Sequence, residues 1–291
     1  MAEPTDLSGK TILITGANSG IGEATARGLA AMGAHILMVA RNREKGEAAR
    51  AGIIERSGNK RVDLLLADLG KLDDIRALAE QVMAKDIGLD VLINNAAIVP
   101  LTRELTKDGL ERQFAVNHLA YLRLTLLLLN LLKASAPSRI INLSSILHTS
   151  GNLDFDNLQS EKSYGPAGLQ TYNNTKLYNV LFTYELARRI AGSGVTVNAV
   201  HPGFLGTNLS RTMPKPLHAV YKAILAGPDR GAKPVIYLAS SPEVEEVSGT
   251  YFDRLEAKPS SAITYDEALA RRLWEVSMAR SGLQESEGIA E

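Results

Sequence analysis

The stretch "TILITGANSGIGEATARGLA", Thr11 to Ala30, joins a short apolar run to a helical pattern through a glycine-rich turn. The run "TILIT" is rich in β-branched residues, which is typical of a strand buried on both faces. Gly16, Gly20 and Gly22 fall between strand and helix, where glycine lets backbone amide groups approach a pyrophosphate. The stretch therefore predicts a nucleotide-binding unit, although its spacing differs from the Gly-x-Gly-x-x-Gly of many dinucleotide folds.

Further strand-like runs follow along the chain, and helical patterns such as "KLDDIRALAEQVMAK" (71–85) lie between them. The runs are "HILMVA" (35–40), "VDLLLA" (62–67), "DVLINN" (90–95), "RIINLSS" (139–145), "VTVNAV" (195–200) and "TYF" (250–252). Because strand and helix alternate, we predict an α/β fold with a doubly wound, parallel, seven-stranded sheet and helices on both faces. No linker, repeat or low-complexity tract divides the chain, so we expect one Rossmann-like domain over residues 1–291.

The composition excludes several classes of function. Lys plus Arg equals Asp plus Glu at 32 each, so no basic field favours nucleic-acid binding. The chain has no cysteine, which excludes disulfides, thiolate catalysis and cysteine-ligated metals. The first residues, "MAEPTDLSGK", lack the pattern of a signal peptide, so we expect a cytoplasmic location. The most apolar stretch, "YLRLTLLLLNLLK" (121–133), falls short of the roughly 20 apolar residues of a membrane span. We expect it to form a buried helix and predict no transmembrane segment.

The residues after the second strand bear on the choice of cofactor. An acidic residue at this point would accept a hydrogen bond from a free ribose 2′-hydroxyl and repel a 2′-phosphate. This chain has Arg41 instead, in "VARNREKG", and a guanidinium favours a phosphate. We therefore predict that NADP(H) is preferred. Because Asn18 and Ser19 bring no basic residue to the glycine turn, NAD(H) stays an alternative, and Arg41 could also be a solvated loop charge.

The segment "TYNNTKLYN" (171–179) places Tyr172 four residues before Lys176. On an α-helix this spacing brings a phenol and an ammonium to the same face. Tyr-x-x-x-Lys is also frequent by chance, so a surface tyrosine beside a solvated lysine is the alternative that the other motifs have to exclude.

Five further motifs support the functional interpretation, and they occur in a fixed order with the glycine turn. They are "NNAA" (94–97), Asn117, "NLSS" (142–145), "YNNTK" (172–176) and "HPG" (201–203). With these motifs the chain resembles the short-chain dehydrogenase/reductase superfamily over about residues 8–255, which leaves 256–291 as a C-terminal helical extension. The segments "DLSGKTILITGANSGIG", "SAPSRIINLSS", "LFTYELARRIAGSGVTVNAVHPG" and "ARRLWEVS" are most similar to the retinol dehydrogenase and WW-domain oxidoreductase group. The chain departs from that group by lacking a membrane-anchoring N-terminal segment and WW modules, and by having Ala97 where glycine is usual.

The resemblance implies four catalytic residues. Tyr172 would act as the general acid or base, and Lys176 would stabilise its phenolate while contacting the nicotinamide ribose. Ser145, which matches the family serine better than Ser144, would hydrogen-bond the substrate oxygen, and Asn117 would hold a water that links Lys176 to solvent. Free tyrosine ionises near pH 10, so an adjacent cation is chemically useful near neutrality. The implied reaction is hydride transfer between nicotinamide C4 and a carbonyl carbon.

The resemblance also implies a set of cofactor contacts that follows the ends of the strands. Asp68 and Leu69 would contact adenine, Asn94 and Ala96 would line the ribose side, and Thr207 would cap the carboxamide. Asx residues after strands often only close turns, which is the structural alternative. The full set is Gly16, Asn18, Ser19, Gly20, Ile21, Gly22, Arg41, Asp68, Leu69, Asn94, Ala96, Tyr172, Lys176, Pro202, Gly203, Leu205 and Thr207. His118, His148 and His201 are not spaced as a metal site, so we predict no metal and structural roles for them.

Two variable segments, 146–171 and 204–227, flank the expected nicotinamide face and carry many apolar side chains. They suggest a bulky hydrophobic aldehyde, ketone or alcohol as substrate, unless these side chains only pack a lid onto the core. The alternatives are an enzyme of the same scaffold with other chemistry, protochlorophyllide-reductase-like or epimerase-like, and a non-enzymatic NADPH-binding regulator.

Helices at 121–133 and 177–192 carry more apolar positions than one sheet-facing stripe requires. Such helices commonly form a four-helix contact in the family, so we expect a homodimer, with a tetramer as the larger alternative. The other explanation is that the C-terminal segment "DEALARRLWEVSMA" covers the surplus apolar surface within the same chain.

Overall fold

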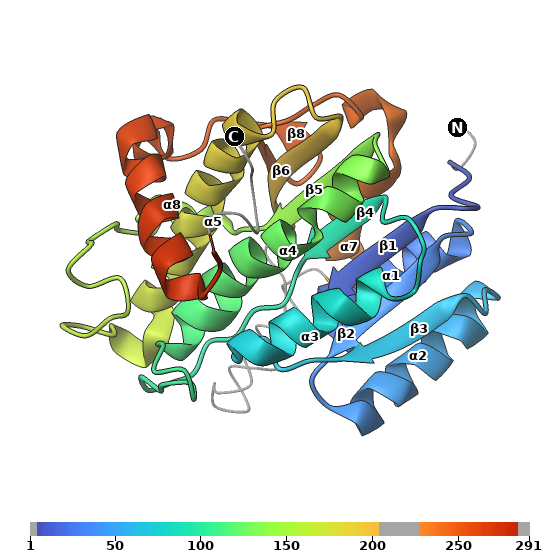
Figure 1. Cartoon of the computed structure of the whole chain (residues 1–291), viewed down its shortest axis with the longest axis horizontal. Helices are drawn as coiled ribbons and strands as arrows, with labels where there is room; N and C mark the ends of the chain where they lie inside the picture. The colour runs from blue at the N-terminus through green and yellow to red at the C-terminus, as the bar shows by residue number, and fades with distance from the viewer. Residues whose placement is uncertain (1–4, 204–226, 285–291) are drawn as a thin grey trace.

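Seven parallel strands form the centre of the computed structural model, which describes residues 5–203 and 227–284 (Figure 1). Their order in the sheet is β3-β2-β1-β4-β5-β6-β7, and a short strand, β8, pairs antiparallel with β7 at the edge. The strands are β1 (Thr11–Thr15), β2 (His35–Ala40), β3 (Val62–Leu66), β4 (Val91–Asn94), β5 (Ser138–Leu143), β6 (Val195–His201), β7 (Thr250–Asp253) and β8 (Glu256–Ala257). The strand order reverses between β1 and β4, and open α/β sheets bind ligands at the carboxyl ends beside such a switch point.

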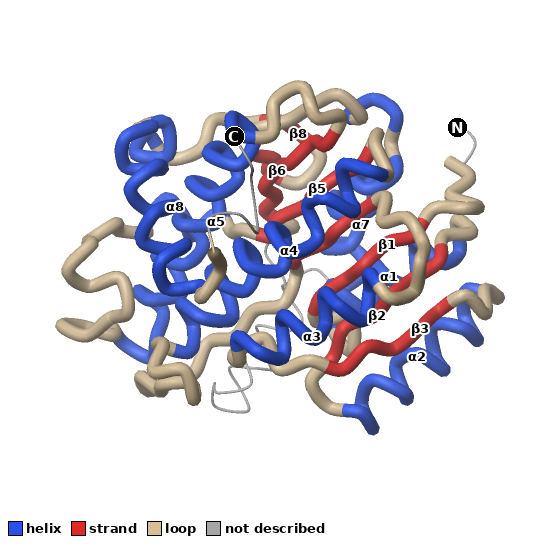
Figure 2. The backbone as a smooth tube through the Cα atoms, viewed as in Figure 1, coloured by secondary structure: helices blue, strands red, loops and turns tan. Residues whose placement is uncertain are grey.

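Helices cover both faces of the sheet (Figure 2). The α-helices are α1 (Gly20–Ala31), α2 (Arg43–Ser57), α3 (Leu72–Met83), α4 (Ala120–Ala134), α5 (Leu169–Arg189), α7 (Pro228–Ser240) and α8 (Glu267–Ser281). The shorter turns are a π-helix, η1 (Phe114–Leu119), and 3₁₀ helices at η2 (Ile146–Ser150), η3 (Pro166–Gly168), η5 (Pro242–Val244) and η6 (Ala262–Tyr265). The predicted parallel sheet with two helical layers is confirmed.

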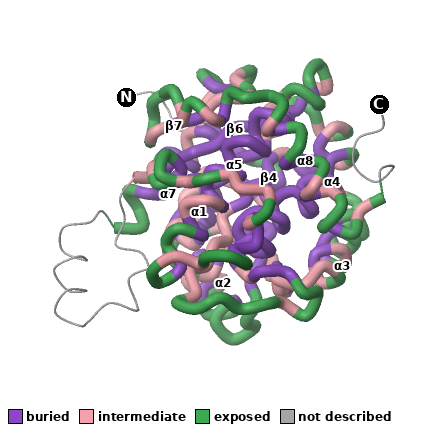
Figure 3. Tube along the Cα trace, turned by 90° about the vertical axis from the view of Figure 1, so that its left-hand side faces the viewer, coloured by how far each residue is buried: buried purple, intermediate pink, exposed green. Residues whose placement is uncertain are grey.

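Alternate residues of the strands enter two separate hydrophobic cores. In β1, Ile12 and Ile14 pack with α1 and α7, whereas Leu13 packs with α3, α4 and α5. Side chains of a strand point to opposite faces in turn, so an uninterrupted apolar run is needed to fill both cores. Figure 3 shows the strands and the adjoining parts of the helices as the buried interior of the molecule.

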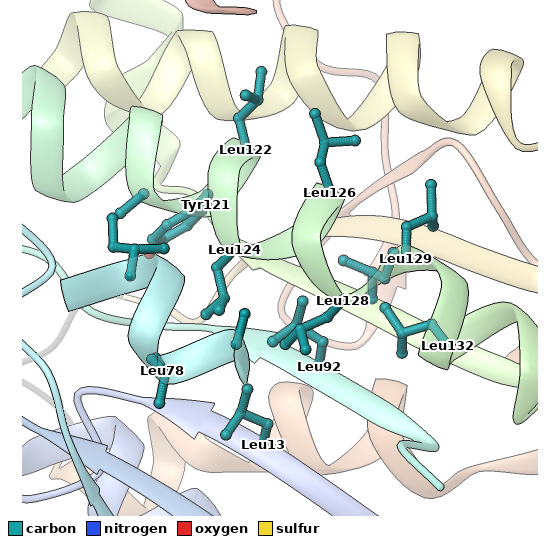
Figure 4. Packing of buried hydrophobic residues seen from close by; sticks show 14 of the residues in the cluster. Leu13, Leu78, Leu92, Tyr121, Leu122, Leu124, Leu126, Leu128, Leu129 and Leu132 are labelled. Atoms are coloured by element: carbon teal, nitrogen blue, oxygen red, sulfur yellow. The ribbon is translucent and has the colours of Figure 1, made fainter. Parts of the chain in front are cut away.

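Helix α4 is buried on more than one side. Leu124 and Leu128 point toward the sheet, while Leu122 and Leu126 point away from it (Figure 4). The outward-pointing leucines are nevertheless buried, because their cluster also contains Phe182 of α5 and Trp274 of α8.

Helix α8 covers the face that α4 and α5 turn away from the sheet. Its Trp274 ring stacks on Phe182 at 5.8 Å between centroids, and the Arg189 guanidinium lies 4.6 Å from the same indole. Ser277 Oγ hydrogen-bonds His118 Nε2 at 2.9 Å, and Arg123 donates to the carbonyl oxygen of Ser281. The C-terminal helix α8 therefore packs on apolar surface of α4 and α5. The expectation of a homodimer rested on the apolar surface of these two helices.

The sequence located β1 to β7 to within a few residues and predicted α1, α3, α4, α8 and part of α5. It gave no range for α2 or α7. It also missed β8 and the π-helix η1, because two exposed residues and a six-residue turn carry no distinctive periodicity. The segment Phe114–Ala134 is long and apolar enough by composition to cross a membrane, but 83% of its most apolar window is buried inside the protein. It is the buried core helix that the sequence predicted.

Candidate active site

A cavity of about 500 Å³ lies at the carboxyl ends of β1 to β6, on both sides of the switch point. Most of the predicted site residues line it. They are Gly16, Asn18, Ser19, Gly20, Ile21, Arg41, Asp68, Leu69, Ala96, Ser145, Tyr172, Lys176, Pro202 and Gly203. Leu205 and Thr207 lie outside the described residues. Segments distant in the sequence thus converge on one chamber, as the motifs predicted.

The glycine turn between β1 and α1 forms one wall of the cavity. Gly16 and Gly20 have φ values of +67° and +61°, which side chains other than glycine rarely adopt. A Cβ atom added at Gly20 would meet nothing within 4 Å, so this part of the turn is open. Ser19 precedes α1 in extended conformation and makes no side-chain cap, which leaves the positive N-terminal end of the helix for an anion. The turn therefore fits a pyrophosphate.

Gly22 and Asn94 have roles other than the predicted cofactor contacts. A Cβ at Gly22 would clash with the carbonyl oxygen of Gly16 and lie 2.5 Å from Asn95 Nδ2, so Gly22 lets α1 pack against the turn. Asn94 is fully buried, and its Nδ2 donates to Thr125 Oγ1 at 3.0 Å and Asn142 Oδ1 at 2.9 Å. Neither residue lines the cavity.

Asn95 occupies the position that the sequence interpretation gave to Asn94. It lines the cavity, and its Nδ2 donates to the carbonyl oxygen of Thr15 at 2.6 Å, which ties β4 to the glycine turn. The period of two along β4 could have revealed the assignment, because it places Asn94 on the same face as Leu92, toward α4.

The adenosine end of the cavity is formed by the ends of β2 and β3. Arg41 is exposed, lines the cavity and has no ion-pair partner among the described residues. Asp68 lines the cavity too, and its Oδ1 also accepts a hydrogen bond from Gly70 N at 3.0 Å. Asp68 therefore closes a turn in addition to facing the chamber, which combines the two roles that the sequence left open.

Tyr172 and Lys176 lie one turn apart on α5, and both face the cavity. Lys176 Nζ is 5.5 Å from the centre of the Tyr172 ring and donates to the carbonyl oxygen of Leu143 at 2.9 Å. The lysine side chain is 1% exposed, and this burial lowers its pKa to about 7. The pair is therefore not a solvated surface pair.

The two serines after β5 differ in their partners. Ser144 Oγ donates to the carbonyl oxygen of Lys176 at 2.8 Å, whereas Ser145 Oγ accepts from Leu147 N at 3.2 Å. Within residues 5–203 and 227–284, no acceptor takes the Ser145 hydroxyl proton, which can therefore bond a ligand in the cavity. His148 supports this position, because its Nδ1 lies 2.7 Å from the carbonyl oxygen of Ser145 and burial lowers its pKa.

Asn117 lies behind the wall of the cavity, in the π-helix. Its Oδ1 accepts from Ile98 N at 2.8 Å, and its Nδ2 donates to the carbonyl oxygen of Ile98 at 2.9 Å and to Thr175 Oγ1 at 3.3 Å. Its own carbonyl oxygen accepts from Asn179 Nδ2 at 2.8 Å. Asn117 therefore joins η1 to the loop after β4 and to α5 behind the Tyr172–Lys176 pair, and its proposed water remains a prediction.

Tyr121 is a neighbour of this pair that the sequence interpretation did not include. Its ring centre lies 5.6 Å from Lys176 Nζ, and its hydroxyl donates to the carbonyl oxygen of Ala96 at 3.0 Å. The sequence could have indicated Tyr121 through its spacing, because it follows Asn117 by one helical turn in "NHLAY".

A glycine turn at a helix N-terminus, beside a buried tyrosine–lysine pair, defines a Rossmann-like oxidoreductase that binds a nicotinamide dinucleotide. The chain matches the short chain dehydrogenase family model over residues 10–217, and it belongs to that family.

Known proteins resemble the chain over nearly its whole length. It is 44% identical to retinol dehydrogenase 14 from Homo sapiens, over 97% of this chain and 89% of that protein. An uncharacterised protein from Mycobacterium paratuberculosis has a crystal structure with a TM-score of 0.79 and 32% identity, covering 97% of both chains. A third protein, described as an NAD(P)-dependent gluconate 5-dehydrogenase from Beutenbergia cavernae with bound NADP, has a TM-score of 0.70 and 28% identity, covering 86% of this chain and 96% of its own.

Proposed function

We propose that the protein is an NADP(H)-dependent oxidoreductase that interconverts a bulky hydrophobic aldehyde or ketone and its alcohol. One observation carries the proposal: Ser145, Tyr172 and Lys176 line the same cavity as the glycine turn and Arg41. A reacting carbonyl bound beside the serine and the tyrosine would then lie at the nicotinamide end of the chamber, with the adenosine end at Arg41.

The protein's own groups move and stabilise the proton. In the reductive direction Tyr172 donates its phenolic proton to the oxygen of the forming alkoxide, and Ser145 donates a hydrogen bond to that oxygen. The Lys176 ammonium lies close enough to stabilise the resulting phenolate. In the oxidative direction the same phenolate takes the proton of the alcohol. The nicotinamide, when bound, supplies or accepts the hydride.

The preference for NADP(H) rests on Arg41. Its guanidinium lies at the end of β2, where the adenosine ribose is bound in doubly wound folds, and it is not engaged by a described carboxylate. The relative from Beutenbergia cavernae was crystallised with NADP, which supports the same choice. NAD(H) remains the alternative, because no second basic residue lines this end of the described cavity.

A hydrophobic substrate is supported by apolar side chains of the cavity. Ile98, Val116 and Leu147 line it, and Leu147 is exposed. Exposed apolar side chains that gather at a cleft are typical of a binding site. The name of the human relative refers to retinol, an apolar alcohol.

Two further properties are proposed on similar grounds. Because α8 covers the outer face of α4 and α5, we propose that the protein is a monomer, in place of the homodimer expected from the sequence. The cytoplasmic location expected from the sequence remains a proposal, which cell fractionation tests.

The function is tested by measuring NADPH oxidation with a panel of carbonyl compounds in which acetaldehyde and acetone are compared with long-chain aliphatic and aromatic aldehydes and ketones. We expect turnover that increases with apolar size. Turnover restricted to small polar carbonyls would contradict the substrate class. Tight NADPH binding without turnover on any member would favour the non-enzymatic alternative.

A further inference from the structure

Lys176 is held between two aromatic rings that come from different helices. Its Nζ lies 5.5 Å from the ring centre of Tyr172 on its own helix and 5.6 Å from that of Tyr121 on α4. Both distances are within the range of a cation–π interaction, which is strongest where water is excluded. Tyr121 and Lys176 are each 1% exposed, so the contact lies in the interior.

The position of the Tyr121 ring is fixed independently of Lys176. The phenol donates to the carbonyl oxygen of Ala96 at 3.0 Å, and the ring belongs to the same buried cluster as Leu92, Leu124 and Leu128 (Figure 4). In addition, burial raises the pKa of Tyr121 well above its ordinary value. The phenol therefore stays neutral, and its ring presents a π face without a full negative charge.

Few other described groups can stabilise the positive charge of Lys176. Among the described residues, Lys176 Nζ donates a hydrogen bond to the carbonyl oxygen of Leu143. Of the charged and titratable side chains that line the cavity, Arg41 and Asp68 lie at its adenosine end, and burial lowers the pKa of His201 to about 4. None of the described carboxylates contributes to the pKa of Lys176, which burial alone lowers.

We propose that Tyr121 is a positioning residue, whose ring, together with that of Tyr172, holds the Lys176 ammonium in place beside the acid/base phenol. It does not touch the substrate and acts through Lys176. The consequence for turnover rests on the proposed function, but the contact itself can be measured in the protein without cofactor or substrate.

The test compares Tyr121→Leu with Tyr121→Phe. Both substitutions remove the hydroxyl that bonds Ala96, but phenylalanine keeps the π face whereas leucine does not. In protein labelled with ¹³C-lysine, the Cε resonance of Lys176 can be followed by NMR. The resonance is assigned by its disappearance in Lys176→Met. Its chemical shift as a function of pH reports the charge of Lys176. Tyr121→Met is a second variant without an aromatic ring. Thermal unfolding, monitored by circular dichroism, shows whether each variant is folded.

Loss of a cation–π contact destabilises the ammonium relative to the amine, so the midpoint of the titration should fall. We expect a fall of about one pH unit in Tyr121→Leu and Tyr121→Met, and little change in Tyr121→Phe. The alkaline limb of carbonyl reduction should move to lower pH in the same two variants. An unchanged midpoint in Tyr121→Leu would overturn the proposal, and so would an equal fall in Tyr121→Phe, since the hydroxyl would then be responsible. A titration shift in a chain that reduces no carbonyl would instead contradict the proposed function alone.

Discussion

The two adjacent serines, Ser144 and Ser145, show how local partners separate residues of the same chemistry. Ser144 donates its proton to the backbone of α5, while Ser145 Oγ, among the residues that the structure describes, only accepts a hydrogen bond, so its proton can bond a substrate oxygen. The motif "NLSS" already favoured Ser145. For the adjacent asparagines, the sequence analysis assigned the cofactor side to Asn94, whereas Asn95 lines the cavity. The motif alone does not say which of two neighbouring side chains faces the core.

Arg41 is the residue on which the cofactor preference depends. Arg41→Asp should replace attraction for the 2′-phosphate by repulsion, at a cost of about 1.5–3 kcal/mol for a hydrogen bond to a charged group. We expect the ratio of kcat/KM for NADPH to that for NADH to fall roughly 10- to 100-fold. Steady-state kinetics with both cofactors measure this ratio.

Arg43→Asp is the matched control, because Arg43 begins α2 and does not line the cavity. It makes the same change of charge two residues further on, and we expect a much smaller effect. Equal effects of both substitutions would show that the net charge of this loop, and not a contact of Arg41, sets the preference.

At the scale of elements, the site depends on how closely α1 and β4 approach the glycine turn. Gly22 packs against Gly16, and Asn95 joins the turn to β4 through the backbone of Thr15. The sequence predicted this strand–turn–helix unit, since apolar runs and glycines are local signals. It did not separate the glycines that face the ligand from the one that only permits close packing, because that difference depends on the neighbouring strand.

Gly22→Ala should therefore weaken the turn. The added methyl group must displace the Gly16 carbonyl or the Asn95 amide, and overpacking of this kind costs about 1–3 kcal/mol of stability. We expect a lower free energy of unfolding in urea and weaker NADPH binding by titration calorimetry.

Gly52→Ala in α2 is the contrasting substitution. There the nearest atom to a new Cβ is Arg56 Nη2 at 3.2 Å, the end of a flexible side chain. Because alanine favours the helix over glycine, we expect a gain of about 0.5–1 kcal/mol with unchanged NADPH binding. A stabilising effect of Gly22→Ala would contradict the packing role given to Gly22.

At the scale of the whole molecule, α8 changes the interpretation of α4 and α5. Their apolar surplus was visible in the sequence, and so was the apolar stripe of the C-terminal helix. The pairing of Trp274 with Phe182 and of Ser277 with His118 joins residues that lie far apart in the chain, so a choice between α8 and a second subunit could not be made from periodicity.

We expect light scattering at micromolar concentration to give a mass near the chain value of 31.3 kDa. The reason is that α8 packs against α4 and α5, the two helices on which the expected four-helix dimer would rest. A mass near twice that value would show that another surface associates, and would contradict the proposed monomer.

The central claim is that Tyr172 exchanges a proton with the substrate while the rest of the chamber binds the cofactor. The most direct measurement compares NADPH affinity and turnover in Tyr172→Phe with those of the unmodified protein, on a carbonyl that the latter reduces. Since only the hydroxyl is removed, we expect the dissociation constant of NADPH to change by no more than a few-fold and turnover to fall roughly 100- to 10,000-fold. Turnover close to that of the unmodified protein would contradict the claim.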